Sequence, residues 1–71
     1  MELFEYAVIY TPRDDAGNVI QDQVQLLTQP TATLAKSGGA VEKQAIADLT
    51  DKSLNYDYVT VIVRPFGRAG Y

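Results

Sequence analysis

The chain has 71 residues, 46% of them hydrophobic, and its nine acidic and six basic residues give a net charge of −3. One small domain is expected at this length, and the lack of cysteine and histidine excludes disulfides, thiolate zinc sites and a histidine base. The scattered, net negative charge argues against nucleic acid or an anionic membrane as a partner.

Residues 3–11 are expected to form the first strand, because β-branched and aromatic side chains dominate them. Both sides of this strand are mostly apolar, which is typical of a central strand. One side carries Phe4, Tyr6, Val8 and Tyr10, and the other carries Leu3, Glu5, Ala7 and Ile9. The strand therefore needs neighbours on both of its edges.

Turn-forming residues at 12–18 predict a hairpin tip, followed by a returning strand over 24–34. Pro30 interrupts that second strand, and proline donates no hydrogen bond to a β-ladder. We therefore expect an edge strand, or one that is bulged at Pro30.

A short helix is predicted over residues 40–49, where Val41, Ala45 and Leu49 recur every four residues. Ser37 or a glycine after it is the expected N-cap, and Glu42 is placed in the first turn. A thin apolar stripe of this kind is stable only when it packs on a sheet. The last strand is predicted over residues 56–65.

The order of elements predicts a small α+β domain covering residues 1–71, with β-β-α-β topology. We expect a three-stranded mixed sheet in the order 2-1-3, with the helix on one face. The Val59, Val61 and Val63 side of the last strand has no polar member, so it is expected under the helix. Glu5 and Arg64 then become cross-strand neighbours on the other face.

The uncovered face is predicted to be apolar, with Leu3, Ala7, Ile9, Tyr58, Ile62 and Leu27 as its members. Exposed patches of this sort usually mark an interaction surface. Arg64 has two interpretations of equal weight: an anchor for a partner, or an exposed ion pair with Glu5. The tail, residues 66–71, is expected to be held by a neighbouring subunit, since free termini are ordered only when tied down. The predicted partner-binding residues are Leu3, Ile9, Tyr58, Ile62, Arg64, Phe66, Arg68 and Tyr71.

No catalytic, cofactor-binding or metal-binding residue is predicted, and we do not expect an enzyme. Asp14 and Asp15 are acidic neighbours, but their spacing matches no calcium loop and favours a solvated turn. Residues 36–39 could hold an anion, yet a plain strand-to-helix turn is favoured because the full phosphate-loop spacing is missing. The aromatic side chains lack the basic surroundings of a nucleic-acid platform.

Three stretches taken together resemble a group of small uncharacterised proteins from tailed bacteriophages. They are Phe4–Tyr10 followed by Pro12, Ala32–Lys36 before the helix, and Val61–Phe66 at the last strand. The chain departs from that layout at Gly38 and Gly39, where a charged helix start would be expected. The shared motifs are strand cores, so the resemblance carries over no functional residue.

The resemblance implies a non-enzymatic virion component, such as a capsid decoration or cement protein that binds the coat through the open sheet face and tail. The alternative that it implies is a small inhibitor of a host enzyme such as RNA polymerase, since phage inhibitors of that kind have a similar layout ending in an Arg-Pro pair. The expected partner is a phage coat protein or further copies of the chain, as a homo-oligomer or a lattice. The expected location is the virion, after synthesis in the host cytoplasm.

Overall fold

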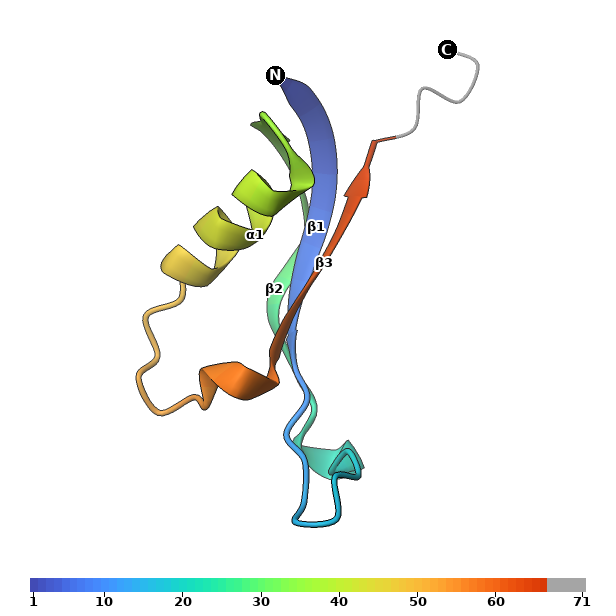
Figure 1. Cartoon of the computed structure of the whole chain (residues 1–71), viewed down its shortest axis with the longest axis vertical. Helices are drawn as coiled ribbons and strands as arrows, with labels where there is room; N and C mark the ends of the chain where they lie inside the picture. Colours follow the sequence, from blue (N-terminus) through green and yellow to red (C-terminus); the bar gives the residue numbers. More distant parts are fainter. Residues whose placement is uncertain (67–71) are drawn as a thin grey trace.

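The computed structural model describes residues 1–66, which form a three-stranded sheet with one helix on one side (Figure 1). The predicted α+β class and the strand order β2-β1-β3 are confirmed. The sheet is antiparallel throughout, so the expectation of a mixed sheet is wrong. β2 and β3 do run parallel to each other, but β1 lies between them and pairs antiparallel with both. The elements are β1 (Glu2–Tyr10), η1 (Gln21–Gln23), β2 (Gln25–Ala35), α1 (Gly38–Ala47), η2 (Tyr56–Tyr58) and β3 (Val59–Pro65).

β1 occupies the centre of the sheet, as its two apolar sides predicted. Its register with β3 is unbroken, from Phe4 opposite Pro65 to Tyr10 opposite Val59. Side chains therefore alternate regularly along β1, and every second one points toward α1. This alternation assigns each residue of β1 and β3 to one of the two faces.

The core lies between the sheet and α1 and is very small. Within residues 1–66 the buried hydrophobic side chains are Phe4 and Val8 from β1 with Val41 and Ala45 from α1. Val61 and Val63 are half-buried on the same side, which confirms the predicted covered face. The described chain measures 45 × 25 × 17 Å, and a two-layer body this thin buries few side chains completely.

The helix starts and ends two residues earlier than predicted, at Gly38 and Ala47. Ser37 is its N-cap, as expected, and its hydroxyl accepts a hydrogen bond from the backbone N–H of Ala40 at 3.2 Å. Glu42 consequently lies beyond the first turn, and the prediction that placed it there is wrong. In the described part of the chain, no helix has both the length and the apolar character needed to cross a bilayer.

Replacing Ser37 with alanine should lower the free energy of unfolding by about 1 kcal/mol, because the first turn loses its side-chain cap. Urea denaturation of the two proteins measures the difference. Ser37→Asp is the matched control, since aspartate caps equally well and should keep the midpoint of the original protein. Equal loss of stability in both variants would contradict a capping role for Ser37.

β2 is an edge strand and is also irregular at Pro30, so both predicted explanations of this proline apply. The ladder with β1 shifts register between the Tyr6–Thr31 and Val8–Thr28 pairs, and again before the Ile9–Leu26 pair. Extra residues on β2 at these points are β-bulges, which bend an edge strand and disrupt its pairing. The two shifts cancel, so Leu26 lies on the side away from α1.

The connection between β1 and β2 is longer than the predicted tip and forms the narrow end of the molecule (Figure 1). The Asp14 carboxylate accepts hydrogen bonds from the N–H groups of Ala16 and Asn18, both at 2.9 Å. Gly17 takes a φ of +84°, a conformation that glycine adopts without strain. The Asp14 side chain therefore stabilises the turn, which agrees with the predicted solvated turn.

The loop from α1 to β3 is organised by Asp51. Its carboxylate accepts hydrogen bonds from the Ser53 hydroxyl at 2.6 Å and the Ser53 N–H at 2.9 Å. These two bonds, the hydroxyl one first, lower the pKa of Asp51 below its ordinary value. A lowered pKa in the folded state means that the interaction stabilises the loop above the unfolded-state pKa and is lost as the pH falls through the folded-state value.

Replacing Ser53 with alanine should raise the pKa of Asp51 toward its ordinary value, because the stronger of its two hydrogen bonds disappears. An NMR titration that follows the Asp51 carboxyl carbon measures the change. Ser53→Thr is the matched control, since it keeps a hydroxyl at this position, and the pKa of Asp51 should stay lowered in that variant. An unchanged Asp51 midpoint would show that the hydroxyl is not the main cause.

Candidate interaction surface

The sheet face opposite α1 carries side chains from all three strands and is covered by none of the described elements. We call it the open face. In the β1–β2 and β1–β3 registers, its rows run across the strands, such as Leu34–Leu3 and Leu26–Ile9–Thr60. Phe66 extends the first row, because its N–H donates to the Leu3 carbonyl at 2.9 Å. The open face consists of Leu3, Glu5, Ala7, Ile9, Leu26, Ala32, Leu34, Thr60, Ile62, Arg64 and Phe66.

Large aliphatic side chains of the open face are strongly exposed. The exposed fraction is 43% for Leu3, 52% for Ile62, 56% for Leu26 and 61% for Leu34. On β2 the usual arrangement is inverted, because Leu26 and Leu34 face outward while two of its threonines lie opposite the buried Phe4 and Val8. This inversion points to an open face that is adapted to contact something other than water.

Glu5 and Arg64 form the predicted cross-strand ion pair on this face. The Arg64 Nε and Nη2 lie 2.7 and 2.6 Å from the same Glu5 carboxylate oxygen. The Arg64 side chain is 74% exposed, so the pair contributes at most about 1 kcal/mol. The pair does, however, orient the Arg64 guanidinium between the row that contains Leu3 and the row that contains Ile62.

A hollow of about 270 Å³ lies beside this ion pair. Its walls include Ala7 and Ile62, and Pro30 borders it from the bulged part of β2. An apolar hollow with an ion pair at its rim, here Glu5 and Arg64, is the type of site that holds an anchoring side chain in protein interfaces. The β2 bulge is therefore part of the surface as well as of the strand.

Other predicted members of the surface differ from expectation. Tyr58 lies in η2, and its ring stands edge-on to that of Tyr10 with centroids 6.4 Å apart. Tyr10 shares the covered side of β1 with Val8, so the placement of Tyr58 on the open face is wrong. Leu27 is half-buried in the bulge of β2, where it has no partner residue on β1.

Phe66 continues the β1–β3 ladder of its own chain, although it was assigned to the tail. Arg68 and Tyr71 lie outside the described residues. Sequence reasoning missed Leu26 and Leu34, both among the exposed hydrophobic residues. Both could have been found from plain side-chain alternation, because they lie eight residues apart on β2 and the two register shifts between them cancel.

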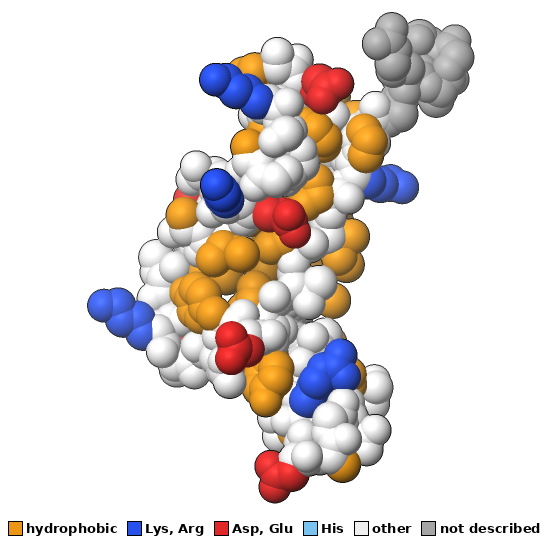
Figure 2. Space-filling model, in the orientation of Figure 1, with side chains coloured by type: hydrophobic (Ala, Val, Ile, Leu, Met, Phe, Trp, Pro, Cys, Tyr) orange, Lys and Arg blue, Asp and Glu red, His pale blue; other side chains and the backbone are white. Residues whose placement is uncertain are grey.

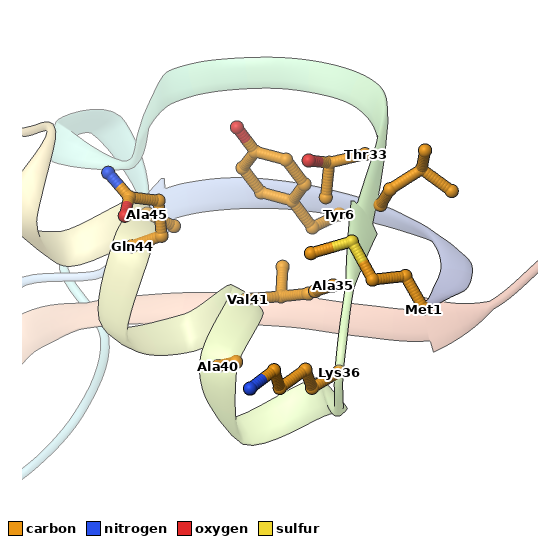
Figure 3. A pocket seen from close by; sticks show the side chains of 10 residues that line it. Met1, Tyr6, Thr33, Ala35, Lys36, Ala40, Val41, Gln44 and Ala45 are labelled. Atoms are coloured by element: carbon orange, nitrogen blue, oxygen red, sulfur yellow. The ribbon is translucent and has the colours of Figure 1, made fainter.

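A second hollow, which the sequence did not predict, lies between α1 and β2. Figure 3 shows the ring of Tyr6 between Gln44 of the helix and Thr33 of β2, with Val41 at its base. Its volume of about 270 Å³ is below the usual range of small-molecule pockets, which starts near 300 Å³. The hollow exists because the threonines of β2 do not fill the space beneath a helix of ten residues.

The remaining candidate chemistry has a structural explanation. Residues 36–39 form the strand-to-helix turn, in which Ser37 caps α1 and Gly38 lies close to Val63 and Phe4. A methyl group on Gly38 would lie 3.8 Å from Val63 and 4.0 Å from Phe4, which is ordinary contact. Within residues 1–66, no group of three or more acidic, histidine or cysteine side chains is placed to hold a metal ion.

Hydrophobic side chains are visible on a second side of the molecule as well. Figure 2 shows them gathered in the middle of the view and along the edge where β3 lies, with charged side chains set between them.

Comparison of the chain with protein-family models, curated proteins and solved structures finds no match. These comparisons therefore assign no family and no function to the chain.

Proposed function

We propose that this is a non-enzymatic interaction protein whose open face binds a protein partner. The observation that carries the proposal is the outward orientation of Leu3, Leu26, Leu34 and Ile62 on a sheet whose other face holds the helix. Four large aliphatic side chains on one face exceed the scattered exposure that a monomer normally shows. The ion pair between Glu5 and Arg64 adds a polar feature with a defined position, which favours one partner over many.

The partner that the resemblance favours is the coat protein of a tailed phage, which would make this chain a capsid decoration or cement protein in the virion. A thin body with an apolar face suits attachment to a shell, because that face can lie on the coat while the helix faces outward. The small core supports the same proposal, since the four core side chains among residues 1–66 provide little stability without a partner.

The alternative, an inhibitor of a host enzyme such as RNA polymerase, uses the same face. It predicts one tightly bound host complex, whereas a virion component remains with purified particles. Affinity capture of the tagged protein from infected cells, with mass spectrometry of the bound proteins, separates the two. A coat protein as the dominant species supports the virion role, and a host enzyme as the dominant species contradicts it and supports inhibition.

A further inference from the structure

The outer edge of β3 has its own pattern of backbone groups. The N–H of Phe66 donates to Leu3 at 2.9 Å, and the N–H of Thr11 donates to Tyr58 at 3.0 Å. These two bonds show that the even-numbered residues along β3 direct their N–H and C=O toward β1. Because these groups alternate along a strand, Val59, Val61 and Val63 direct theirs to the outer edge.

Two of the outward N–H groups have no bonding partner among residues 1–66. The N–H of Val59 donates to the Tyr56 carbonyl in η2, and Pro65 has no N–H. The donors of Val61 and Val63 remain, together with outward carbonyls along the strand. Within the described chain β3 pairs with β1 alone, so this edge is open.

The two edges of the sheet are protected to different degrees. β2 carries Pro30 and two register shifts, which are devices that prevent pairing with another chain. β3 contains five consecutive β-branched residues from Val59 to Val63, with no proline, charge or bulge among them. An edge of this composition is a template for another strand.

We propose that a second copy of this chain pairs with β3, antiparallel and centred on Val61, so that two three-stranded sheets become one six-stranded sheet. In this register the two Val61 residues exchange both of their hydrogen bonds, and each Val63 N–H donates to the Val59 carbonyl of the other copy. Four hydrogen bonds result, and every open donor of the edge is used.

Charge complementarity near the ends of β3 favours the antiparallel orientation and a second copy of this chain as the partner strand. Each β3 has Arg64 near one end and Asp57 just before the other. Antiparallel pairing centred on Val61 brings Arg64 of each copy to the end of the seam at which η2 of the other copy, with the oppositely charged Asp57, lies. Parallel pairing would place like charges side by side, which is unfavourable. The seam is the edge of the sheet and not the open face, so this inference does not depend on the proposed function.

The dimer is expected to be of micromolar strength, because one strand edge buries less than the roughly 1,200 Å² of a standard interface. Sedimentation velocity from about 1 to 200 µM should show the original protein shifting from monomer to dimer. Val61→Pro should raise the dissociation constant at least about tenfold, since it removes two of the four hydrogen bonds. The internal ladder stays intact, because the Val61 N–H does not face β1.

Val61→Thr is the matched control, since it keeps the N–H and the β-branched shape, and Leu26→Asp on the open face should also still dimerise. Circular dichroism establishes that each variant is folded. A monomer for the original protein at about 200 µM overturns the proposal, even if a segment of some other protein pairs with β3. Undiminished dimerisation of a folded Val61→Pro protein overturns it too.

Cysteine cross-linking tests the same β3–β3 pairing without a proline. The proposal can therefore still be tested if the Val61→Pro variant does not fold. The chain has no cysteine of its own, which makes single substitutions unambiguous. Val61→Cys should form a disulfide between copies under mild oxidation, because residues paired across antiparallel strands lie within disulfide reach. Thr60→Cys is more exposed but out of register with itself, and should cross-link far less. Equal cross-linking of the two variants would overturn the register and the seam.

Discussion

Replacing Phe4 with alanine is expected to leave most of the protein unfolded at room temperature. Phe4 is 6% exposed and is one of the four core side chains that the described part of the chain contains. Truncating a buried phenylalanine typically costs about 3–5 kcal/mol, and a single core in a chain this small rarely supplies more than about the same amount. The loss therefore equals most of the stability that is available.

Leu3→Ala provides the matched control, because Leu3 is the next residue along the same strand and faces the opposite side. It is 43% exposed, so we expect a cost below about 1 kcal/mol. Urea denaturation followed by circular dichroism compares the two variants with the original protein. Similar midpoints for Phe4→Ala and Leu3→Ala would mean that the covered side of the sheet is not the core.

Placing aspartate on the open face is expected to abolish binding of the partner while the fold survives. Leu26→Asp and Ile62→Asp each put a charge on a side chain that is more than half exposed, so folding loses little. In the complex the new carboxylate would be buried against apolar surface, and the cation nearest to position 62, Arg64, is already paired with Glu5, so burial costs several kcal/mol. Binding should fall by at least about a hundredfold, measured by calorimetry with the purified captured partner.

Ile46→Asp makes the same chemical change at a site on α1, where the side chain is 40% exposed. It should bind the partner as the original protein does, because α1 lies on the other side of the sheet. Leu26→Asp has a further use, since β2 is the edge far from β3. It separates loss of partner binding from loss of dimerisation. Normal binding by folded Leu26→Asp and Ile62→Asp proteins would contradict the proposed surface.

The apolar pattern of the sequence predicted the parts of the fold that depend on burial. The two apolar sides of β1 placed it at the centre, and the all-valine side of β3 was placed correctly under the helix. The Glu5–Arg64 pair followed from these two assignments and is confirmed. Such features are encoded in side-chain alternation, which the chain displays directly.

Features that depend on backbone detail could not be predicted in the same way. Pro30 indicated an irregularity, but not the two register shifts, which bring Thr28 to the covered side while Leu26 and Ala32 stay on the open face. Side-chain alternation predicts a last strand that starts at Tyr56, because η2 leaves no signal in alternation, and this places Tyr58 on the wrong face. The helix begins two residues before the predicted start, because the Ser37 cap outweighs the low helix propensity of Gly38 and Gly39.

Photo-cross-linking from the two sides of the sheet tests the central claim most directly. A photoreactive phenylalanine analogue is placed at Leu26 on the open face or at Ile46 on α1, and each folded protein is irradiated with its captured partner. The open-face proposal predicts a covalent adduct with the partner from position 26 and little from position 46. An adduct from position 46 alone would contradict it and would assign partner binding to the helix side of the molecule.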